Sequence, residues 1–247
     1  MALEKPIIGL TCAWSVETWG NTLEHGGYYY VGSYYANAIS KSGGFPLILA
    51  IPPKEELIED FVEEVLLNVD GLLFTGGGDA KRFGKEEMPS LREQQPHRYS
   101  FEERLLVRAW ESDIVTMGIC RGFQMMVEVF GGKLFDGTIE GHKQKAPGFT
   151  ASHKVKVSEG SKLYLITGAS ALEVNSFHVQ AVEVVPKGFL ANAISEDGIV
   201  EGIEAKDKSF FLGFQFHPEE RYEFDPYEKK IFDAFIKASR GRRRGRK

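Results

Sequence analysis

The sequence predicts an α/β protein in which a mostly parallel sheet lies between two layers of helices. Short apolar runs alternate with longer stretches in which apolar residues recur at helical spacing. Strands and helices that alternate in this way form parallel pairs, because each helix returns the chain to the same end of the sheet. Later in the chain strands predominate, so we expect a strand-rich C-terminal half.

In the first half of the chain, short apolar runs alternate with segments whose apolar residues have helical spacing. Buried strands are expected at Ile7–Cys12, Leu47–Ile51, Gly71–Thr75 and Ile114–Ile119. Helices are expected at Tyr28–Ser42, Glu55–Asn68, Phe101–Glu111 and Arg121–Phe130. Glycine pairs at Gly43-Gly44 and Gly131-Gly132 follow two of these helices and fit C-terminal caps.

After Gly132 the pattern becomes strand-rich. Strands are expected at Lys154–Val157, Leu172–Ser176, Leu190–Ser195, Ile199–Ala205 and Phe210–Phe216. Asp197-Gly198 has the sequence of a hairpin turn. A final helix at Pro226–Ser239 presents apolar side chains on one face. Because no repeat or linker interrupts the chain, residues 1–239 are expected to form a single domain.

One long segment breaks the alternation. Residues 76–100 combine many charged side chains with Pro89 and Pro96 and show no apolar pattern that would form a core. The segment follows the carboxyl end of the strand at Gly71–Thr75, the edge at which open α/β sheets bind ligands. We expect either a lid over a site at that edge or a surface excursion.

The charge of the chain is divided between an acidic body and a basic end. The net charge is −5, although residues 240–247 carry six basic groups. An acidic body disfavours nucleic acid as the main substrate, because phosphate binding needs a basic surface. The basic end is expected to be a solvated, disordered tail. With no membrane-spanning apolar stretch and no signal-peptide pattern, the protein is expected to be soluble and cytoplasmic.

A cysteine between two glycines is the strongest candidate for a reactive group. Cys120 lies in the Gly-x-Cys-x-Gly sequence of residues 118–122, between a predicted strand and a predicted helix. This is the pattern of a nucleophile elbow, a turn too tight for side chains beside the central residue. The amino end of the helix favours the thiolate, which is the nucleophile. The alternative is a structural cysteine, which is the role expected for Cys12 at the end of an apolar run.

A thiolate nucleophile needs a base, and two histidines compete for that role. His217 follows the apolar run Phe210–Phe216 and precedes Pro218 and Glu219. Side chains two residues apart in extended structure face the same way, so Glu219 can accept a hydrogen bond from the imidazole. His178 also follows a predicted strand but has no carboxylate so close in sequence. The residues favour His217, with a surface turn at His-Pro-Glu and a base at His178 as the alternatives.

The sequence shows no spacing typical of a metal site. Two cysteines are too few for a cysteine-built site or a disulfide framework. No two of the six histidines have the i, i+4 spacing of a helical metal site. We therefore expect neither a metal nor another cofactor.

Several stretches of the chain resemble a known family. Gly118–Gln124 and Phe214–Glu219 together resemble the class I glutamine amidotransferase superfamily. Gly76–Asp79, Val174–Val182 and Asp197–Glu204 are similar to the γ-glutamyl-γ-aminobutyrate hydrolase (peptidase C26-like) family. The resemblance runs from the first strand to about Glu219. It implies a three-layer αβα fold of the flavodoxin-like, glutamine amidotransferase type.

The resemblance also implies roles for individual residues. A triad of Cys120, His217 and Glu219 would cleave a γ-glutamyl amide through a thioester. The oxyanion hole would be formed by main-chain N–H groups at Gly77, Gly78 and Arg121. The substrate would be held by Gln124 and by the main chain of Ser176 and Phe177, with His178 as a wall or positioning residue.

The chain departs from the family pattern at three places beside this site. Val127 stands where an Asn is common, Lys81–Phe83 stand where a Pro is common, and Arg98-Tyr99 replaces an Arg-Asp pair. These departures leave the hydrolytic chemistry intact and the identity of the leaving amine open.

Three functions are compatible with the sequence. The first is a free-standing hydrolase of γ-glutamyl amides in polyamine or amino-acid breakdown, with a small-molecule substrate. The second is a glutaminase subunit that supplies ammonia to a synthase partner, and the third is a regulatory binding protein without turnover. Segment 76–100 and Asn175–His178 favour the first, because a synthase subunit normally leaves the rim of its active site to its partner. The intact triad disfavours the third, and a homodimer stays open.

Overall fold

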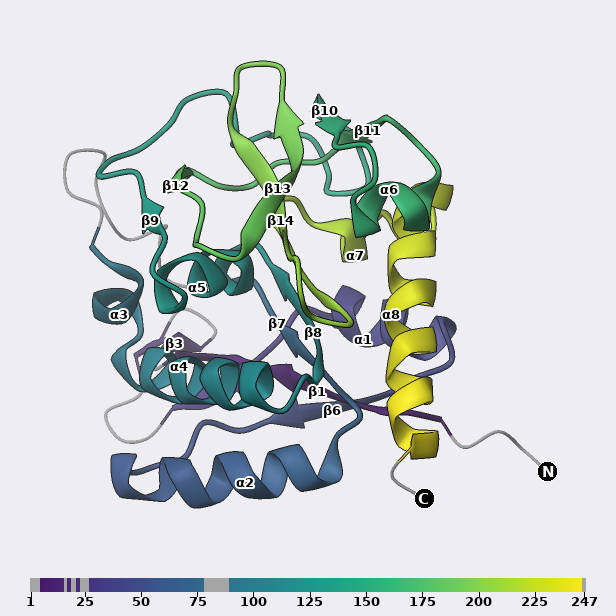
Figure 1. Cartoon of the computed structure of the whole chain (residues 1–247). Coiled ribbons are helices and arrows are strands. Elements are labelled where there is room, and N and C mark those ends of the chain that lie inside the picture. Colours follow the sequence, from purple (N-terminus) through teal and green to yellow (C-terminus); the bar gives the residue numbers. More distant parts are fainter. Residues whose placement is uncertain (1–4, 16, 19–20, 23–26, 78–88, 246–247) are drawn as a thin grey trace.

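The computed structural model describes residues 5–15, 17–18, 21–22, 27–77 and 89–245 (Figure 1). Within them, nine strands form a central sheet in the order β11-β10-β13-β14-β15-β8-β7-β1-β6. The α/β class predicted from the alternating pattern is confirmed. None of the described helices combines the length and apolar character needed to cross a bilayer.

One half of the sheet is parallel, as the strand–helix alternation predicts. Its strands are β1 (Ile7–Thr11), β6 (Phe45–Leu49), β7 (Gly71–Phe74), β8 (Val115–Ile119) and β15 (Phe211–Phe214). β1 pairs with β6 and β7, and β8 pairs with β7 and β15, all in parallel. The carboxyl ends of these strands therefore meet at one edge, where ligands bind in open α/β sheets.

The other half of the sheet is antiparallel and comes from the strand-rich part of the chain. Its strands are β10 (His153–Val157), β11 (Ala171–Val174), β13 (Phe189–Ser195) and β14 (Val200–Ala205). β14 pairs antiparallel with β15 and joins the two halves into one mixed sheet. Among the described residues, three small two-stranded sheets lie outside it. They pair β2 (Ala13–Ser15) with β5 (Tyr28–Tyr30), β3 (Glu17–Thr18) with β4 (Asn21–Thr22), and β9 (Lys133–Leu134) with β12 (Val182–Val184).

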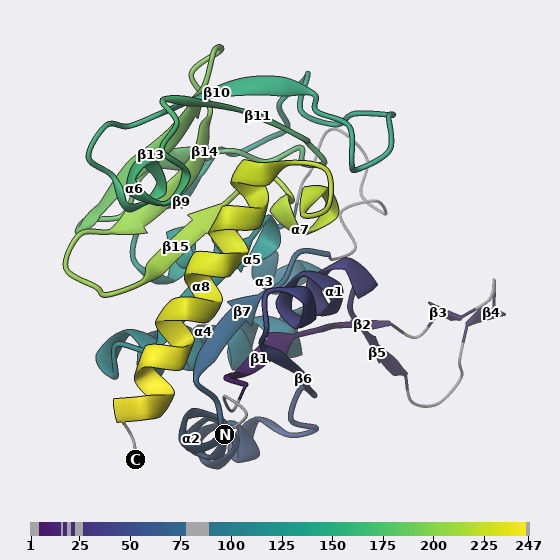
Figure 2. The ribbon, with the colours of Figure 1, turned by 90° about the vertical axis from the view of Figure 1, so that its right-hand side faces the viewer.

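Helices cover both faces of the parallel half (Figure 1 and Figure 2). One layer contains α2 (Ile58–Asn68), α4 (Pro96–Glu111) and α5 (Arg121–Val129). The opposite layer contains α1 (Ser33–Lys41) and the long α8 (Pro226–Gly245), with α6 (Lys162–Thr167) packed against α8. Short helical turns are η1 (Glu55–Leu57), α3 (Leu91–Gln94) and α7 (Pro218–Arg221).

The two helical layers enclose two separate apolar cores. Leu72 and Phe74 of β7 belong to the core beneath α2, α4 and α5, whereas Leu73 belongs to the core beneath α1 and α8. All three side chains are fully buried. A strand buried on both faces has no polar alternation, which is why β7 appears in the sequence as a continuous apolar run. Each such side chain stabilises the fold by about 1.5–3 kcal/mol.

The boundaries differ from the sequence-based expectation at the first helix. The expected helix at Tyr28–Ser42 begins only at Ser33, because Tyr28–Tyr30 form β5 and pair with β2. The strand expected at Leu47–Ile51 lies two residues earlier, at Phe45–Leu49, where its register with β1 places it.

Segment 76–100 is only partly a loop. Residues 78–88, the central part of the predicted lid, lie outside the described residues. Residues 91–94 and 96–100 are helical instead of irregular. A capping box between Ser90 and Glu93 starts α3, and Leu91 is fully buried. The start of α4 shows no apolar pattern in the sequence because two of its buried positions carry charged side chains. These are Arg98 and Glu102, which form a buried ion pair.

The basic end of the chain continues α8 as far as Gly245, so the disordered tail expected at 240–247 is wrong for its first six residues. Residues 246–247 lie outside the described part. The arginines do not point only into solvent. Arg240 donates to the Gly43 carbonyl, Arg242 donates to the Ser112 carbonyl, and Arg243 donates to the Asp70 carboxylate at 2.8 Å. These hydrogen bonds explain why the helix continues after its last apolar residues.

We expect Arg243→Ala to lower the free energy of unfolding by about 1–2 kcal/mol, because the buried Asp70 carboxylate loses a charged hydrogen-bond donor. Urea unfolding followed by circular dichroism measures the change. Lys237→Ala, at an exposed position of the same helix, is the matched control and should shift the value by less than about 0.5 kcal/mol. Equal effects of the two substitutions would mean that the end of α8 adds no stability.

Candidate active site

Cys120 occupies a strained turn between β8 and α5. Its backbone has φ 52° and ψ −105°, a conformation that residues other than glycine rarely adopt. The turn packs tightly because its flanking glycines carry no side chain. A Cβ on Gly122 would lie 2.1 Å from the Phe74 carbonyl oxygen, and one on Gly118 would lie 2.8 Å from the Gly122 main chain. The geometry has the features of the nucleophile elbow that the sequence predicts.

His217 lies just after β15 and before α7, and its ring is held by Glu219. The distance from His217 Nδ1 to Glu219 Oε1 is 2.6 Å, and both side chains are buried. Burial opposes the imidazolium, but the negative charges of Glu219 and Cys120 raise the pKa of His217 well above its usual value. Glu219 therefore orients the ring through Nδ1 and leaves Nε2 for another partner.

The main chain of His217 is fixed by a distant asparagine. Asn175 accepts a hydrogen bond from the His217 N–H at 2.8 Å and donates to the His217 carbonyl at 3.0 Å. Because the side chain of Asn175 is fully buried, this clamp has no competition from water. It joins the loop after β11 to the end of β15.

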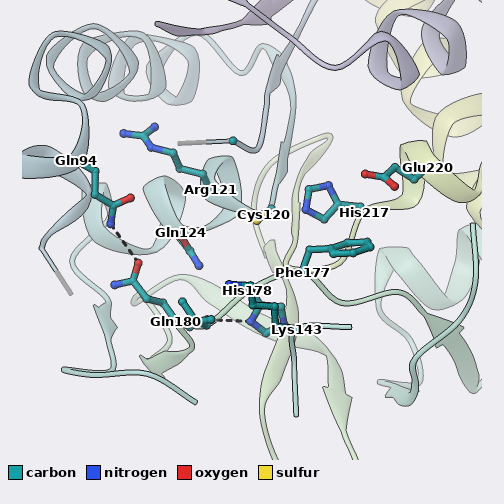
Figure 3. A pocket seen from close by; sticks show the side chains of 12 residues that line it. Gln94, Cys120, Arg121, Gln124, Lys143, Phe177, His178, Gln180, His217 and Glu220 are labelled. Carbon is teal, nitrogen blue, oxygen red and sulfur yellow. Dashed lines mark hydrogen bonds between the residues drawn. The ribbon is translucent and has the colours of Figure 1, made fainter. Parts of the chain in front are cut away.

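Cys120 and His217 line one cavity of about 320 Å³ (Figure 3). Gly76 lies between them and β7. A Cβ on Gly76 would be 3.0 Å from His217 Cε1 and 3.3 Å from the Cys120 Cβ. A larger residue at Gly76 would therefore press against both side chains, so its missing side chain lets cysteine and histidine meet.

A buried arginine fixes the loop that follows β7. Arg98 donates to the carbonyls of Thr75 at 2.7 Å, Gly76 at 3.3 Å and Gly77 at 2.9 Å. The N–H and C=O of a trans peptide point in opposite directions, so the Gly77 N–H is turned away from Arg98. Gly77, at φ 82°, lines the cavity beside Cys120. Gly78, the other loop residue predicted for the oxyanion hole, lies outside the described residues.

Arg98 belongs to an ion network that reaches the elbow helix. Its Nε donates to Glu102 at 2.7 Å, and Arg121 donates to the other oxygen of the same carboxylate. Figure 3 shows the Arg121 side chain directed away from Cys120. Arg121 is the first residue of α5, so its main-chain N–H has no partner within the helix. The main chain of Arg121, and not its guanidinium, is therefore available at the cavity.

Tyr35 of α1 supports the same loop from the other layer of helices. Its hydroxyl accepts a hydrogen bond from the Gly76 N–H at 3.0 Å. Burial, together with the charges of Glu219 and Cys120, raises the pKa of Tyr35 well above its usual value, so the hydroxyl stays neutral. Sequence reasoning missed Tyr35, Arg98 and Asn175. The i, i+4 spacing of Arg98 and Glu102 was a usable signal, whereas Tyr35 and Asn175 act through contacts between distant segments.

The residues predicted to hold substrate divide into two groups. Gln124, Phe177 and His178 line the cavity. The Phe177 ring packs edge-on against the His217 ring, with 5.9 Å between the ring centroids. Ser176 does not line it. Its N–H donates to the Gln144 side chain at 2.8 Å and its carbonyl accepts from the Gln144 N–H at 2.9 Å, so its main chain is already paired.

Within the described part of the chain, the cavity is also lined by four polar residues that sequence reasoning did not identify: Gln94, Lys143, Gln180 and Glu220. Gln94 donates to Gln180 across the cavity wall at 3.4 Å, as Figure 3 shows. Glu220 lies beyond His217, and burial raises the pKa of its carboxyl group. Lys143 is exposed and brings an opposite charge to the cavity. Their positions depend on tertiary packing, and no local pattern marked them.

We expect iodoacetamide to modify Cys120 in the folded protein and to leave Cys12 unmodified. Cys12 is fully buried and donates to the Leu49 carbonyl at 3.1 Å, and burial raises the pKa of its thiol to about 11. Peptide mass spectrometry should find one adduct at Cys120 in buffer and two adducts in denaturant. Native Cys120→Ala protein is the control and should stay unlabelled. Labelling of Cys12 in the native state would contradict the burial described here.

Comparisons with known proteins agree with this architecture. The family model described as Peptidase C26 matches residues 6–219. The γ-glutamyl-γ-aminobutyrate hydrolase PuuD of Escherichia coli (strain K12) is 30% identical over 220 residues, which cover 83% of this chain and 84% of PuuD. The glutamine amidotransferase-like protein YvdE of Lactococcus lactis is 32% identical over 200 residues, covering 78% and 82% of the two chains. The crystal structure of a protein from Thermoplasma acidophilum, described as a subunit of GMP synthase, shares the fold, with a TM-score of 0.65 and 19% identity over 98% of each chain. The chain belongs to the Peptidase C26 family.

Proposed function

We propose that this protein is a cysteine-dependent hydrolase that cleaves γ-glutamyl amides through a thioester. The observation that carries the proposal is the pairing of a strained, cavity-lining Cys120 with a histidine that Glu219 orients at 2.6 Å. This is the arrangement of nucleophile, base and orienting group that acyl transfer needs. Membership of the Peptidase C26 family supports the same class of reaction.

The first step would form the thioester. The Cys120 thiolate attacks the γ-carbonyl carbon of the substrate, and the carbonyl electron pair moves to oxygen. The N–H groups of Gly77 and Arg121 would hold this oxyanion, since both residues line the cavity beside Cys120. When the intermediate collapses, the carbon–nitrogen bond breaks and the His217 imidazolium gives its proton to the departing amine.

The second step would release glutamate. His217, now neutral, takes a proton from water as the water oxygen attacks the thioester carbonyl. The oxyanion forms in the same place, and the carbon–sulfur bond then breaks to return the thiolate and the imidazolium. The raised pKa of His217 favours the imidazolium that protonates the departing amine in the first step.

The charges around the cavity suit a glutamyl group. A γ-glutamyl substrate carries an α-carboxylate and an α-ammonium at one end. Lys143 and Glu220 offer the complementary charges, and the amides of Gln124 and Gln180 offer uncharged hydrogen-bond partners. We propose that these four residues and the Phe177 ring form the surface that recognises the glutamyl end. They replace the main chain of Ser176, which the sequence had suggested for this role.

The leaving amine is proposed from a relative and not from the cavity. PuuD, at 30% identity, is named for hydrolysis of γ-glutamyl-γ-aminobutyrate. We propose a γ-glutamyl amine of this kind as the substrate, in a cytoplasmic pathway of polyamine or amino-acid breakdown, with no partner protein needed for turnover.

His217 is expected to be the base and His178 a wall residue. His217→Asn should lower kcat by about three orders of magnitude or more, because the base and the nucleophile act as a unit. Glu219→Gln should cost less, since it removes the orienting group alone. Steady-state kinetics on a γ-glutamyl amide compares these variants with His178→Asn, which should retain most of kcat. A larger loss in His178→Asn than in His217→Asn would reverse the two assignments.

The purified protein alone should hydrolyse γ-glutamyl-γ-aminobutyrate with a higher kcat/KM than glutamine. The experiment measures kcat/KM for both compounds and for other γ-glutamyl amines, with Cys120→Ala as the inactive control. Intact-protein mass spectrometry of a rapidly quenched reaction should also reveal the glutamyl thioester on Cys120. Turnover of glutamine alone, and only after a second protein is added, would contradict the proposal and favour the role of a glutaminase in a larger synthase.

A further inference from the structure

Three histidines and one glutamate from four separate segments meet beside the wall of the active-site cavity. Glu201 of β14 is fully buried. Its Oε1 lies 3.0 Å from His142 Nδ1, 3.2 Å from His178 Nε2 and 3.4 Å from His153 Nε2. The sequence spacing of these histidines gave no sign of a cluster, and the fold brings them together.

In His142 and His178, the ring nitrogen that faces away from Glu201 is a hydrogen-bond donor. His178 Nδ1 lies 3.0 Å from the Gln180 carbonyl oxygen, which can only accept, so this nitrogen carries a hydrogen. His142 Nε2 lies 3.0 Å from the Asp197 carboxylate and carries one for the same reason. In their neutral forms, both rings then direct a lone pair towards Glu201. Lone pairs that face a buried carboxylate repel it unless a positive charge lies between them, either a proton on the ring or a metal ion.

The third histidine and the second carboxylate oxygen lack hydrogen bonds. Neither ring nitrogen of His153 has a hydrogen-bond partner among the described residues, although both are buried, and the same holds for Glu201 Oε2. A buried polar group without a partner costs about 1–3 kcal/mol. The cluster thus combines an excess of lone pairs with a shortage of donors.

The dimensions of the cluster match those of a small divalent cation. Zinc binds nitrogen and oxygen ligands at about 2.0–2.1 Å, which places tetrahedral ligand atoms about 3.3 Å apart. The distances from Glu201 Oε1 to the facing nitrogens of His142 and His153 are 3.0 and 3.4 Å. The ligand atoms of His142, His153 and Glu201 all lie within 4.8 Å of one another. The hydrogen bond between His142 Nε2 and the Asp197 carboxylate is typical of a metal-bound histidine.

We propose that His142, His153 and Glu201 bind a divalent transition metal of the zinc class. Imidazole nitrogens with one carboxylate suit zinc better than magnesium or calcium, which prefer oxygen ligands. The metal ties β10 and β14 to the loop that carries His142. The His142 carbonyl accepts a hydrogen bond from the His178 N–H at 2.9 Å, which connects this loop to the cavity wall. The argument for this site does not rest on the proposed function.

Metal binding is best measured in Cys120→Ala protein, in which the reactive thiol cannot compete for the metal. The full-length protein is stripped with EDTA and titrated with Zn²⁺ against a chromogenic chelator. We expect one equivalent to bind per chain. His153→Ala and Glu201→Gln in the same background should weaken binding at least a hundredfold. His97→Ala, at an exposed histidine of α4, is the matched control and should bind as the parent does.

A second cluster must be separated from the first, because His217, Glu219 and Glu220 also offer ligand atoms close to one another. His217→Asn should keep the bound equivalent. Loss of binding in His217→Asn, with His153→Ala unaffected, would overturn the proposal, and so would a folded parent protein that takes up no zinc.

One measurement on the parent protein does not depend on the folding of any variant. Co²⁺ should give the visible absorption bands of a tetrahedral site. Absence of these bands at one bound equivalent would overturn the assignment.

Discussion

The candidate site depends on the close approach of β7 and α5 at Gly122. With no side chain there, the first turn of α5 lies directly against the main chain of Phe74, and a Cβ would reach 2.1 Å from its carbonyl oxygen. This contact leaves Cys120 at φ 52° in a conformation that costs about 1–3 kcal/mol. Apolar burial on both faces of the sheet offsets the strain, and the thiol projects from a rigid frame into the cavity.

A second constraint is the buried network of Arg98, Glu102 and Arg121. Both ends of the Arg98–Glu102 pair are fully buried, so removing one partner would leave an uncompensated charge, a change that costs about 3–5 kcal/mol in other proteins. The planar fork of Arg98 holds several carbonyls of the loop after β7 at once, which a lysine could not do. The network thereby mounts this loop and the elbow helix on α4, and the Gly77 N–H and Cys120 keep a fixed relation.

The antiparallel half of the sheet completes the cavity from the other side. Asn175 links the loop after β11 to the main chain of His217, so the candidate base is held by both halves of the sheet. The loop from Asn175 to Gln180 supplies the wall opposite the elbow. Behind that wall, the histidines gathered around Glu201 join four segments that are far apart in sequence. The cavity thus lies where the parallel and antiparallel halves meet.

The sequence by itself determined the features that depend on short-range geometry. Alternating apolar and helical patterns predicted the α/β class, the glycines beside Cys120 predicted the turn, and the two-residue spacing predicted the pairing of His217 with Glu219, because each depends on the geometry of neighbouring residues. Only the tertiary structure decided what depends on contacts between distant segments. Gln144 forms hydrogen bonds with the main chain of Ser176, and arginines beyond residue 239 lie in a continuation of α8. The ion pair of Arg98 and Glu102 is buried in a segment that appears polar in the sequence. A partner many residues away leaves no periodic trace in the chain, since its position is fixed only when the segments pack.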